Sequence, residues 1–454
     1  MRIKFMKIEM LKVFFLLGLW IPPRALGGEM GIWDCVRSSI TAHPRVRAGL
    51  SRLEQAKSAV DEDRTLFKPE LSFGARYAAN TYVAEINLPG RKIPLGGHNE
   101  TTLTLQAGHL LYDWGRRENK LQGDKELKKA GWEAVRSLRE GLAFETGSAY
   151  LSLLGARREL QIALRNVEIA ESHHRHLVNI YNQEMTTYDE VLKAEVDLDR
   201  ARILASRLRN QVELARARLL EIMGLPLETE VSFRDSTEGI PEVPPEELKL
   251  ELALSRRPDL AVYDARLAAL ESFTASYSGE RKPEVRLFAG GNYGKPGVDM
   301  FRNEWITYGQ AGVKVDWNFW DWGRKDFHVA KARAEWDETV ADRRDLEQSI
   351  ALELENASLD EKEAADRVKL AGTALNAAKE HFRIVSARFD QAQVTNKDCL
   401  DARESAMISE FEYSGAVIDL VRARWRIAYV CGRLAVEIES RWPDLVLEKD
   451  GKSK

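Results

Sequence analysis

The sequence has few cysteines, no strong excess of either charge and no long apolar run. Its three cysteines, Cys35, Cys399 and Cys431, are widely spaced and odd in number, which predicts neither a disulfide framework nor a cysteine metal site. The 67 basic and 71 acidic residues leave a net charge of −4, which argues against nucleic-acid binding. No apolar stretch reaches the roughly 20 residues of a membrane-spanning helix. With a mean hydropathy of −0.38, the composition alone suggests a water-soluble chain.

The first 28 residues have the pattern of a secretory signal. Basic residues precede the apolar run 13–21, and the small residues Ala25, Gly27 and Gly28 follow it. The run is too short to anchor the chain as a membrane helix. Residues 1–28 are therefore predicted to be a signal peptide, and the protein is expected to be exported. Cys35 has no lipobox before it, so no lipid anchor is predicted there.

Proline is missing from two long stretches, 95–225 and 297–442. Because proline interrupts helices, its absence permits very long ones in both places. Four prolines instead cluster between positions 226 and 245, which predicts a linker over 225–247. This linker separates two halves of the chain.

The two halves repeat one another. Residues 111–117 (Leu-Tyr-Asp-Trp-Gly-Arg-Arg) resemble 319–325 (Phe-Trp-Asp-Trp-Gly-Arg-Lys), at an offset of 319 − 111 = 208. The tripeptide Lys-Pro-Glu at 68–70 recurs at 282–284, at an offset of 282 − 68 = 214. A duplication this long argues for two structural halves and against a solenoid of short repeats. The predicted organisation is a first repeat at 29–224, a second at 248–440 and a C-terminal tail at 441–454.

Each half contains an apolar seam in steps of three and four residues, which is the pattern of a coiled coil. The seams predict two long helical hairpins, 114–224 and 321–432. If 114–184 is a single helix, its length is roughly 106 Å at 1.5 Å per residue. Cys399 falls on the second seam, which predicts a buried thiol.

Four segments have the alternating period of strands instead: 69–83, 98–112, 283–294 and 305–320. Each has one apolar and one polar face, and aromatic residues lie towards the ends, as in membrane strands. A soluble four-stranded sheet covered by a helix fits the same pattern. If the strands do lie in a membrane, four cannot close a barrel, and open edges are not tolerated in lipid. Several copies must then share one barrel.

Taken together, these features resemble the TolC-type outer membrane efflux proteins over essentially the whole mature chain. The resemblance rests on the twofold repeat, the Asp-Trp-Gly-Arg motifs, the gap-free hairpins and two further pairs of motifs. These are His43-Pro44 with Arg257-Pro258, and Lys68-Pro69 with Lys282-Pro283. It implies a mostly α fold with membrane β-strands. In it, antiparallel coiled-coil hairpins form a periplasmic α-barrel, and four strands per protomer join a trimeric 12-stranded barrel in the outer membrane.

The resemblance also implies where function resides, namely at the hairpin tips that close the tunnel. Asp398 and Asp401 lie three residues apart on one helix face, matching the Asp-x-x-Asp-Ala of the family. In a trimer they would form carboxylate rings that attract cations; a solvated helix face is the other interpretation. The expected gate and tip contacts are Glu190, Phe389, Glu184 and Ala392.

The tips also depart from the family pattern. Glu184 and Ala392 replace its glycines, and Val394 replaces a basic residue found in some members. These departures put the usual adaptor docking and gate-locking salt bridge in doubt, and they leave Thr186 and Thr187, or Thr395 and Asn396, as candidate helix caps.

The expected function is an outer membrane exit duct of a tripartite efflux or type I secretion system, extending into the periplasm. It would pass drugs, ions or polypeptides from an inner-membrane RND or ABC transporter, joined by a periplasmic adaptor (membrane fusion) protein. The alternative is a periplasmic coiled-coil adaptor or scaffold. No catalytic motif is present, so neither enzyme activity nor a cofactor is expected. A metal site at His173 and His176 is disfavoured, since no further ligand has the right spacing.

Overall fold

The computed structural model describes residues 29–241, 244, 248–299, 301–391 and 393–445. The predicted signal peptide 1–28 and the tail from 446 onwards lie outside the described residues, as do five positions of the predicted linker. The chain divides into two compact units, formed by Met1–Ser39, Thr146–Ile240 and Ala371–Val421, and by Ile40–Glu145, Pro241–Leu370 and Arg422–Lys454. Each unit draws on both sequence halves. The division therefore does not follow the repeat boundary.

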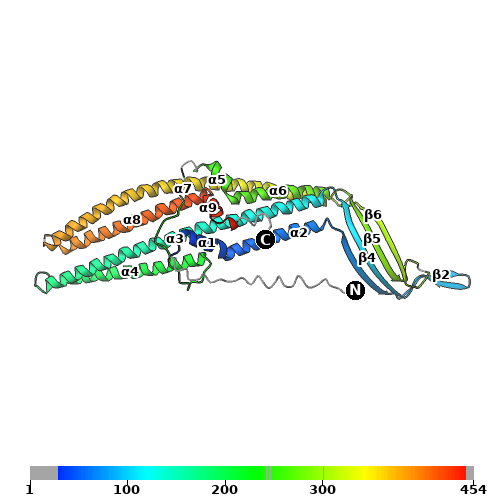
Figure 1. The fold of residues 1–454 in the computed structure, drawn as a ribbon, viewed down its shortest axis with the longest axis horizontal. Coiled ribbons are helices and arrows are strands. Elements are labelled where there is room, and N and C mark those ends of the chain that lie inside the picture. The colour runs from blue at the N-terminus through cyan, green and yellow to red at the C-terminus, as the bar shows by residue number, and fades with distance from the viewer. Residues whose placement is uncertain (1–28, 242–243, 245–247, 300, 392, 446–454) are drawn as a thin grey trace. The chain divides into compact units, whose positions relative to one another are not determined.

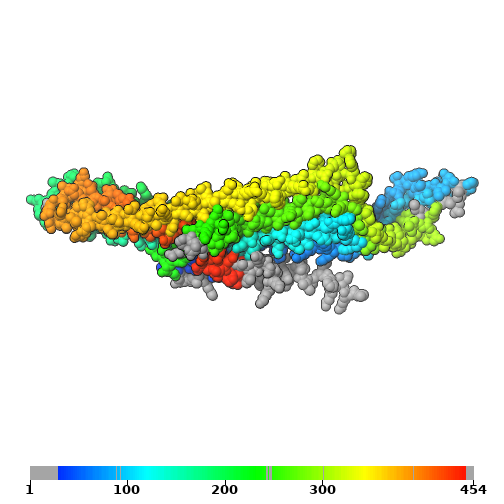
Figure 2. Space-filling view, turned by 90° about the horizontal axis from the view of Figure 1, so that it is seen from above, coloured from blue at the N-terminus to red at the C-terminus, as the bar shows by residue number. Residues whose placement is uncertain are grey.

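The second unit contains one four-stranded antiparallel sheet in the order β1-β4-β5-β6 (Figure 1). Its strands are β1 (Glu70–Ala79), β4 (Asn99–Tyr112), β5 (Glu284–Lys295) and β6 (Ile306–Asp316). The centre of the sheet joins the two halves, because β4 pairs with β5 from Thr101↔Lys295 to Tyr112↔Val285. Figure 2 shows the blue surface of the first-half strands beside the lime-green surface of β5 and β6.

The strands differ from the prediction in three places, the first of which is β1, which ends at Ala79 and not at the predicted residue 83. A short hairpin, β2 (Glu85–Leu88) and β3 (Arg91–Pro94), follows β1 and turns at Gly90, whose φ is +85°. It lies in the longer connection of the first half, at the end of the sheet away from α2 and α6 (Figure 1). The last strand ends at Asp316, four residues before the predicted end. The chain turns between this strand and the next helix, where Trp322 and Gly323 take φ of +60° and +81°.

One face of the sheet is apolar and uncovered. Alternate side chains of β1 are exposed at Leu71 (75%) and Phe73 (70%), and those of β6 at Val313 (61%) and Val315 (62%). A sheet with its apolar face in water would need a covering layer. No helix of the same unit supplies one over the described residues, so the soluble interpretation of these strands loses its main support.

The helices agree with the long proline-free stretches. They are α1 (Ile32–Ala42), α2 (Pro44–Thr65), α3 (Arg116–Tyr181), α4 (Tyr188–Ile222), α5 (Leu250–Arg256), α6 (Pro258–Gly279), α7 (Arg324–Asp390), α8 (Asn396–Val430) and α9 (Arg433–Arg441). A short 3-10 turn, Pro443–Leu445, follows α9. Two helices precede the strands in each half where one was expected. The break has one cause in both places, since Pro44 and Pro258 stand at the first turn of a new helix.

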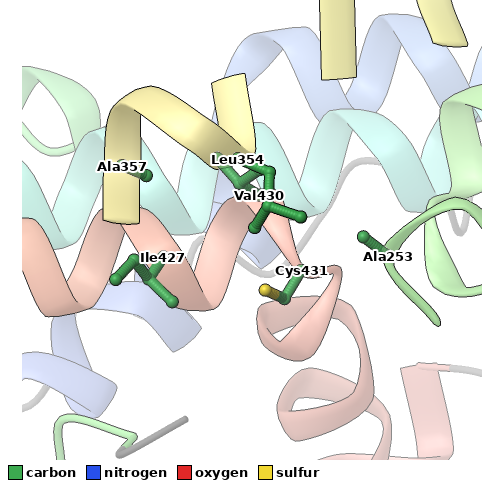
Figure 3. Close-up of a cluster of buried hydrophobic side chains, with 6 residues drawn as sticks. All are labelled: Ala253, Leu354, Ala357, Ile427, Val430 and Cys431. Atoms are coloured by element: carbon green, nitrogen blue, oxygen red, sulfur yellow. The ribbon is translucent and has the colours of Figure 1, made fainter. Parts of the chain in front are cut away.

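One packed cluster of the second unit lies where three helices of the second half meet. A buried cluster joins Ala253 of α5, Leu354 and Ala357 of α7, and Ile427 and Val430 of α8 (Figure 3). Two members of the cluster on different helices are alanines, which lets those backbones approach closely. Cys431 is fully buried in the same cluster and ends it at the turn to α9.

The first unit holds the hairpin ends, and small apolar clusters repeat along each pair of helices. Ala170 packs with Leu198 and Ala201 between α3 and α4, and Leu177 packs with Val191 one step nearer the tip. In the second hairpin Cys399 is buried with Val385 and Ala402, as the seam predicted. The helices therefore meet as a coiled coil in this unit.

Candidate functional site

The turn of the first hairpin, between α3 and α4, has a strained backbone. Glu184 takes φ of +62°, a conformation that glycine adopts readily and other residues rarely do. The N–H of Met185 bonds back to the carbonyl of Ile180, at 3.0 Å, so the helix closes with the wrapped-back geometry usual for a glycine end. Thr187 precedes α4 but makes no side-chain capping bond.

We predict that Glu184→Gly stabilises this turn by up to about 1 kcal/mol, because it removes the left-handed strain. The measurement is the melting temperature of the purified protein. Gln183→Gly is the matched control: its φ is not positive, so it should lose about 0.5–1 kcal/mol. If both variants lose stability equally, the strain argument is wrong and the Glu184 side chain itself makes the tip contact.

The turn of the second hairpin, between α7 and α8, is closed by a capping box. The backbone N–H and the hydroxyl of Thr395 both donate to Asp398 Oδ2, at 2.9 and 2.6 Å, and the Asp398 N–H donates to the Thr395 hydroxyl at 3.2 Å. Thr395 is thus the cap among the candidates. Ala392, the other expected tip residue, lies outside the described residues.

The two predicted ring residues stand on the first two turns of α8, and both are exposed. Hydrogen bonds from Thr395 hold the pKa of Asp398 below its usual range, which keeps this carboxylate charged. The sequence did not predict that Asp398 accepts these capping bonds, which occupy one of its two carboxylate oxygens. Whether Asp398 and Asp401 form rings depends on other copies of the chain, so that role stays a prediction.

A contact between the two hairpin ends was missed by the sequence reasoning. Asn396, buried at the start of α8, donates its amide to Glu190 Oε2 of α4 at 2.8 Å. Its carbonyl oxygen lies 2.6 Å from Nε2 of His173 on α3. Glu190 also accepts from Lys193 at 2.9 Å, and these two hydrogen bonds lower its pKa. The predicted contact residue Glu190 thus holds one hairpin to the other.

A buried ion pair lies two turns further along α8. Arg403 is 6% exposed and pairs through Nη2 with Asp197 of α4, while its Nε and Nη1 have no partner in the described structure. In the sequence, only the position of this arginine next to the seam residue Ala402 indicated that it could be buried. Its partner could not be read, because nothing in the sequence states which way α4 faces.

Phe389 fills the space beneath this contact. Its ring lies 5.3 Å from that of His173 and 6.2 Å from that of His176, and it packs in the apolar clusters of both hairpins. His176 is 4.0 Å from Asp390, too far for a strong bond. Among the described residues, no group of three or more histidines, cysteines or carboxylates is placed to hold a metal.

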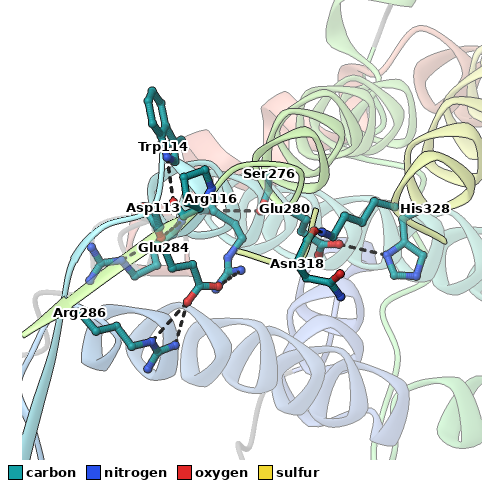
Figure 4. Close-up of polar contacts among 12 residues, drawn as sticks. Asp113, Trp114, Arg116, Ser276, Glu280, Glu284, Arg286, Asn318 and His328 are labelled. Atoms are coloured by element: carbon teal, nitrogen blue, oxygen red, sulfur yellow. Dashed lines mark hydrogen bonds and ion pairs between the residues drawn. The ribbon is translucent and has the colours of Figure 1, made fainter. Parts of the chain in front are cut away.

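The repeated Asp-Trp-Gly-Arg motif forms the junction between strand and helix. Trp114 and Trp322 both take φ of +60°, and the glycine after each is also left-handed, so the duplication is structural as well as sequential. In the first copy, Asp113 accepts from the Arg117 N–H at 3.1 Å, and Arg116 pairs with Glu284 at 2.5 Å (Figure 4). The junction thereby fixes α3 to the neighbouring strand β5.

Comparison with known proteins agrees with this geometry. The family model described as outer membrane efflux protein matches residues 36–225 and 250–432, which is most of the chain. The chain belongs to the outer membrane efflux protein family. That membership places it in the outer membrane, and it confirms the TolC-type resemblance.

Individual members of the family are distant in sequence. Protein CyaE of Bordetella pertussis is 21% identical over 252 residues, covering 55% of this chain and about half (51%) of its own length. Outer membrane protein OprJ of Pseudomonas aeruginosa is 22% identical over 357 residues, covering 72% and 71%. The CmeC outer membrane channel of Campylobacter jejuni has a TM-score of 0.75 at 15% identity, covering 88% of this chain and 85% of that one. The fold of this efflux protein is therefore that of the channel.

No helix among the described residues has both the length and the apolar character to cross a membrane.

Proposed function

We propose that this efflux protein is a passive exit duct, built from three copies whose sheets join into one 12-stranded barrel. One observation carries the proposal: a four-stranded sheet with an uncovered apolar face is attached to long helical hairpins. Among the described residues, β1 pairs only with β4 and β6 only with β5, so the outer edge of each strand is unpaired. Such edges are not tolerated in lipid, and joining β6 of one copy to β1 of the next removes them.

The hairpins supply a second reason for assembly. One side of α4 packs inside the hairpin, but apolar residues on it are also exposed: Leu192 (41%), Val196 (51%), Ile203 (62%) and Leu214 (71%). These residues form a stripe along the helix. An exposed stripe of this length is typical of a surface that is covered in the assembly. A neighbouring copy would cover it if the helices form a tube.

The proposed duct performs no chemistry and draws no energy of its own. A periplasmic adaptor and an inner-membrane pump, of either the proton-driven or the ATP-driven class, would supply the cargo at the hairpin tips. Two comparisons support this role: the matched family consists of outer membrane efflux proteins, and CmeC is an outer membrane channel. No nucleic acid or cofactor takes part.

Reconstitution in planar bilayers tests the proposal against the scaffold alternative. The duct should insert, give discrete conductance steps, resist carbonate extraction from membranes and run as a trimer in detergent. A monomeric, carbonate-extractable protein without conductance would favour a periplasmic scaffold.

The acidic tip gives the duct an expected selectivity. We predict that replacing Asp398 and Asp401 with asparagine weakens the preference for cations, because two rings of negative charge are lost. Asparagine is chosen over alanine since its side-chain oxygen can still accept the Thr395 capping bonds. The measurement is the reversal potential in a salt gradient, with Asp419→Asn, far from the tip on α8, as the control. An unchanged reversal potential in the double variant rejects the rings.

A further inference from the structure

We propose that His173 is a proton sensor, which loosens the contact between the two hairpin ends when its surroundings become acidic. The inference rests on the proposed duct, since it concerns the regulation of the same tip. The inference adds to the proposed duct a residue whose protonation would change the state of the tip. The contact joins α3, α4, α7 and α8 of one chain.

The bonding at Asn396 assigns the proton on His173. The Asn396 amide N–H donates to Glu190, so its carbonyl oxygen faces the imidazole and must accept. His173 therefore donates from Nε2. The ring lies against Phe389 on one side, at 5.3 Å between centroids.

The charges around His173 come from each helix packed against it. Arg403 on α8 is the facing cation, and Asp197 on α4 is the facing anion, already paired with that arginine. Glu190 on α4 is reached only through Asn396, and it is shared with Lys193. His176 lies on the same helix as His173, and Asp390 on α7 faces His176.

Protonation of His173 would therefore place a second cation next to a guanidinium that has a single carboxylate. Two nitrogens of Arg403, Nε and Nη1, are already buried without hydrogen-bond partners, so this part of the contact has no spare acceptor. The nearby pair of His176 and Asp390 has side chains that are 47% and 66% exposed, so solvent screens it.

The sign of the effect follows from burial. Burial holds the pKa of His173 below its ordinary 6.5, against the opposing effect of its hydrogen bond to Asn396, and Arg403 acts in the same direction as burial. Because its pKa is lowered in the folded state, His173 stabilises the contact fully only above pH 6.5, where the imidazole is neutral. That support is lost as the pH falls through 6.5 towards the lowered value.

Single-channel recording at pH 7.5 and pH 5.5 tests the inference. Wild-type channels should show a severalfold higher open fraction at pH 5.5. His173→Gln keeps a donor for Asn396 and cannot titrate, so it should lose this response. His174→Gln, at the neighbouring position, should respond as the wild type does.

A second variant guards against misfolding. His173→Phe keeps a ring beside Phe389 and also cannot titrate, so it too should lose the response. Both variants are first checked for trimers in detergent. If either assembled variant keeps the wild-type response, the sensor is overturned while the duct stands. If wild-type channels conduct equally at both pH values, the sensor also fails, whereas absence of any conductance would instead reject the duct.

Discussion

Replacing Asp197 with asparagine should destabilise the hairpin ends by roughly 3–5 kcal/mol, because it leaves the buried Arg403 charge without a carboxylate. Two nitrogens of this guanidinium, Nε and Nη1, already have no hydrogen-bond partner, so the neighbourhood has no acceptor to replace Asp197. The expected result is a lower melting temperature of the detergent-solubilised protein and a higher baseline conductance in bilayers.

Two further variants show whether the lost pair is the cause. Asp199→Asn removes a nearby carboxylate that is 62% exposed and lies 3.5 Å from Arg202, so it should change stability by less than about 0.5 kcal/mol. Replacing both partners, as Asp197→Leu with Arg403→Met, should recover most of the loss, since no isolated charge remains. If Asp197→Asn matches Asp199→Asn, the pair does not hold the hairpins together.

Glu140→Gln should stabilise the second unit at alkaline pH and change little in acid. Glu140 is buried on α3, and its Oε1 accepts from the Ala435 N–H of α9 at 3.3 Å. Burial raises its pKa to about 8, against the partly opposing effect of Arg257. The side chain is therefore largely protonated at neutral pH, and glutamine resembles that form.

The direction follows from proton binding. Since the folded state holds the Glu140 proton more tightly than the unfolded state, wild-type stability falls as the pH rises from the unfolded value near 4.5 to about 8. The full difference is of order 5 kcal/mol. Melting curves at pH 4.5 and pH 9 measure it. Glu145→Gln on the same helix, where the carboxylate is 45% exposed, is the control and should show no such dependence. A pH-independent difference between Glu140→Gln and wild type would contradict the assigned pKa.

Much of the fold could be predicted because it depends on local patterns. Proline-free seams fixed the helices α3 and α7, and alternation located the four strands within a few residues. The β2–β3 hairpin was missed although Pro89-Gly90 is a turn signal, because its alternating flanks are only four residues each. The early end of β6 was missed because apolar residues continue past Asp316 into the left-handed turn at Trp322.

The site was predictable only in part, for a physical reason. Positions along one helix can be read from spacing, so Asp398, Asp401 and Glu190 were placed near the tip. Partners on different helices depend on how each helix is rotated, which the spacing does not state. The bonds from Asn396 to His173 and Glu190 are of that kind, as is the Arg403 pair. The family pattern did not help, since these residues lie outside its motif.

The central claim is that β6 of one copy joins β1 of the next. Within one copy, β1 and β6 are three strand spacings apart, roughly 14 Å, too far for a disulfide. One cysteine at Ser72 on β1, scanned against single cysteines over positions 309–313 of β6, therefore reports only contacts between copies. The native cysteines are buried and should not interfere. After oxidation, denaturing gels should show cross-linked bands that stop at three copies. Bands that never exceed the monomer, or a ladder that continues beyond three, would contradict the closed trimeric barrel.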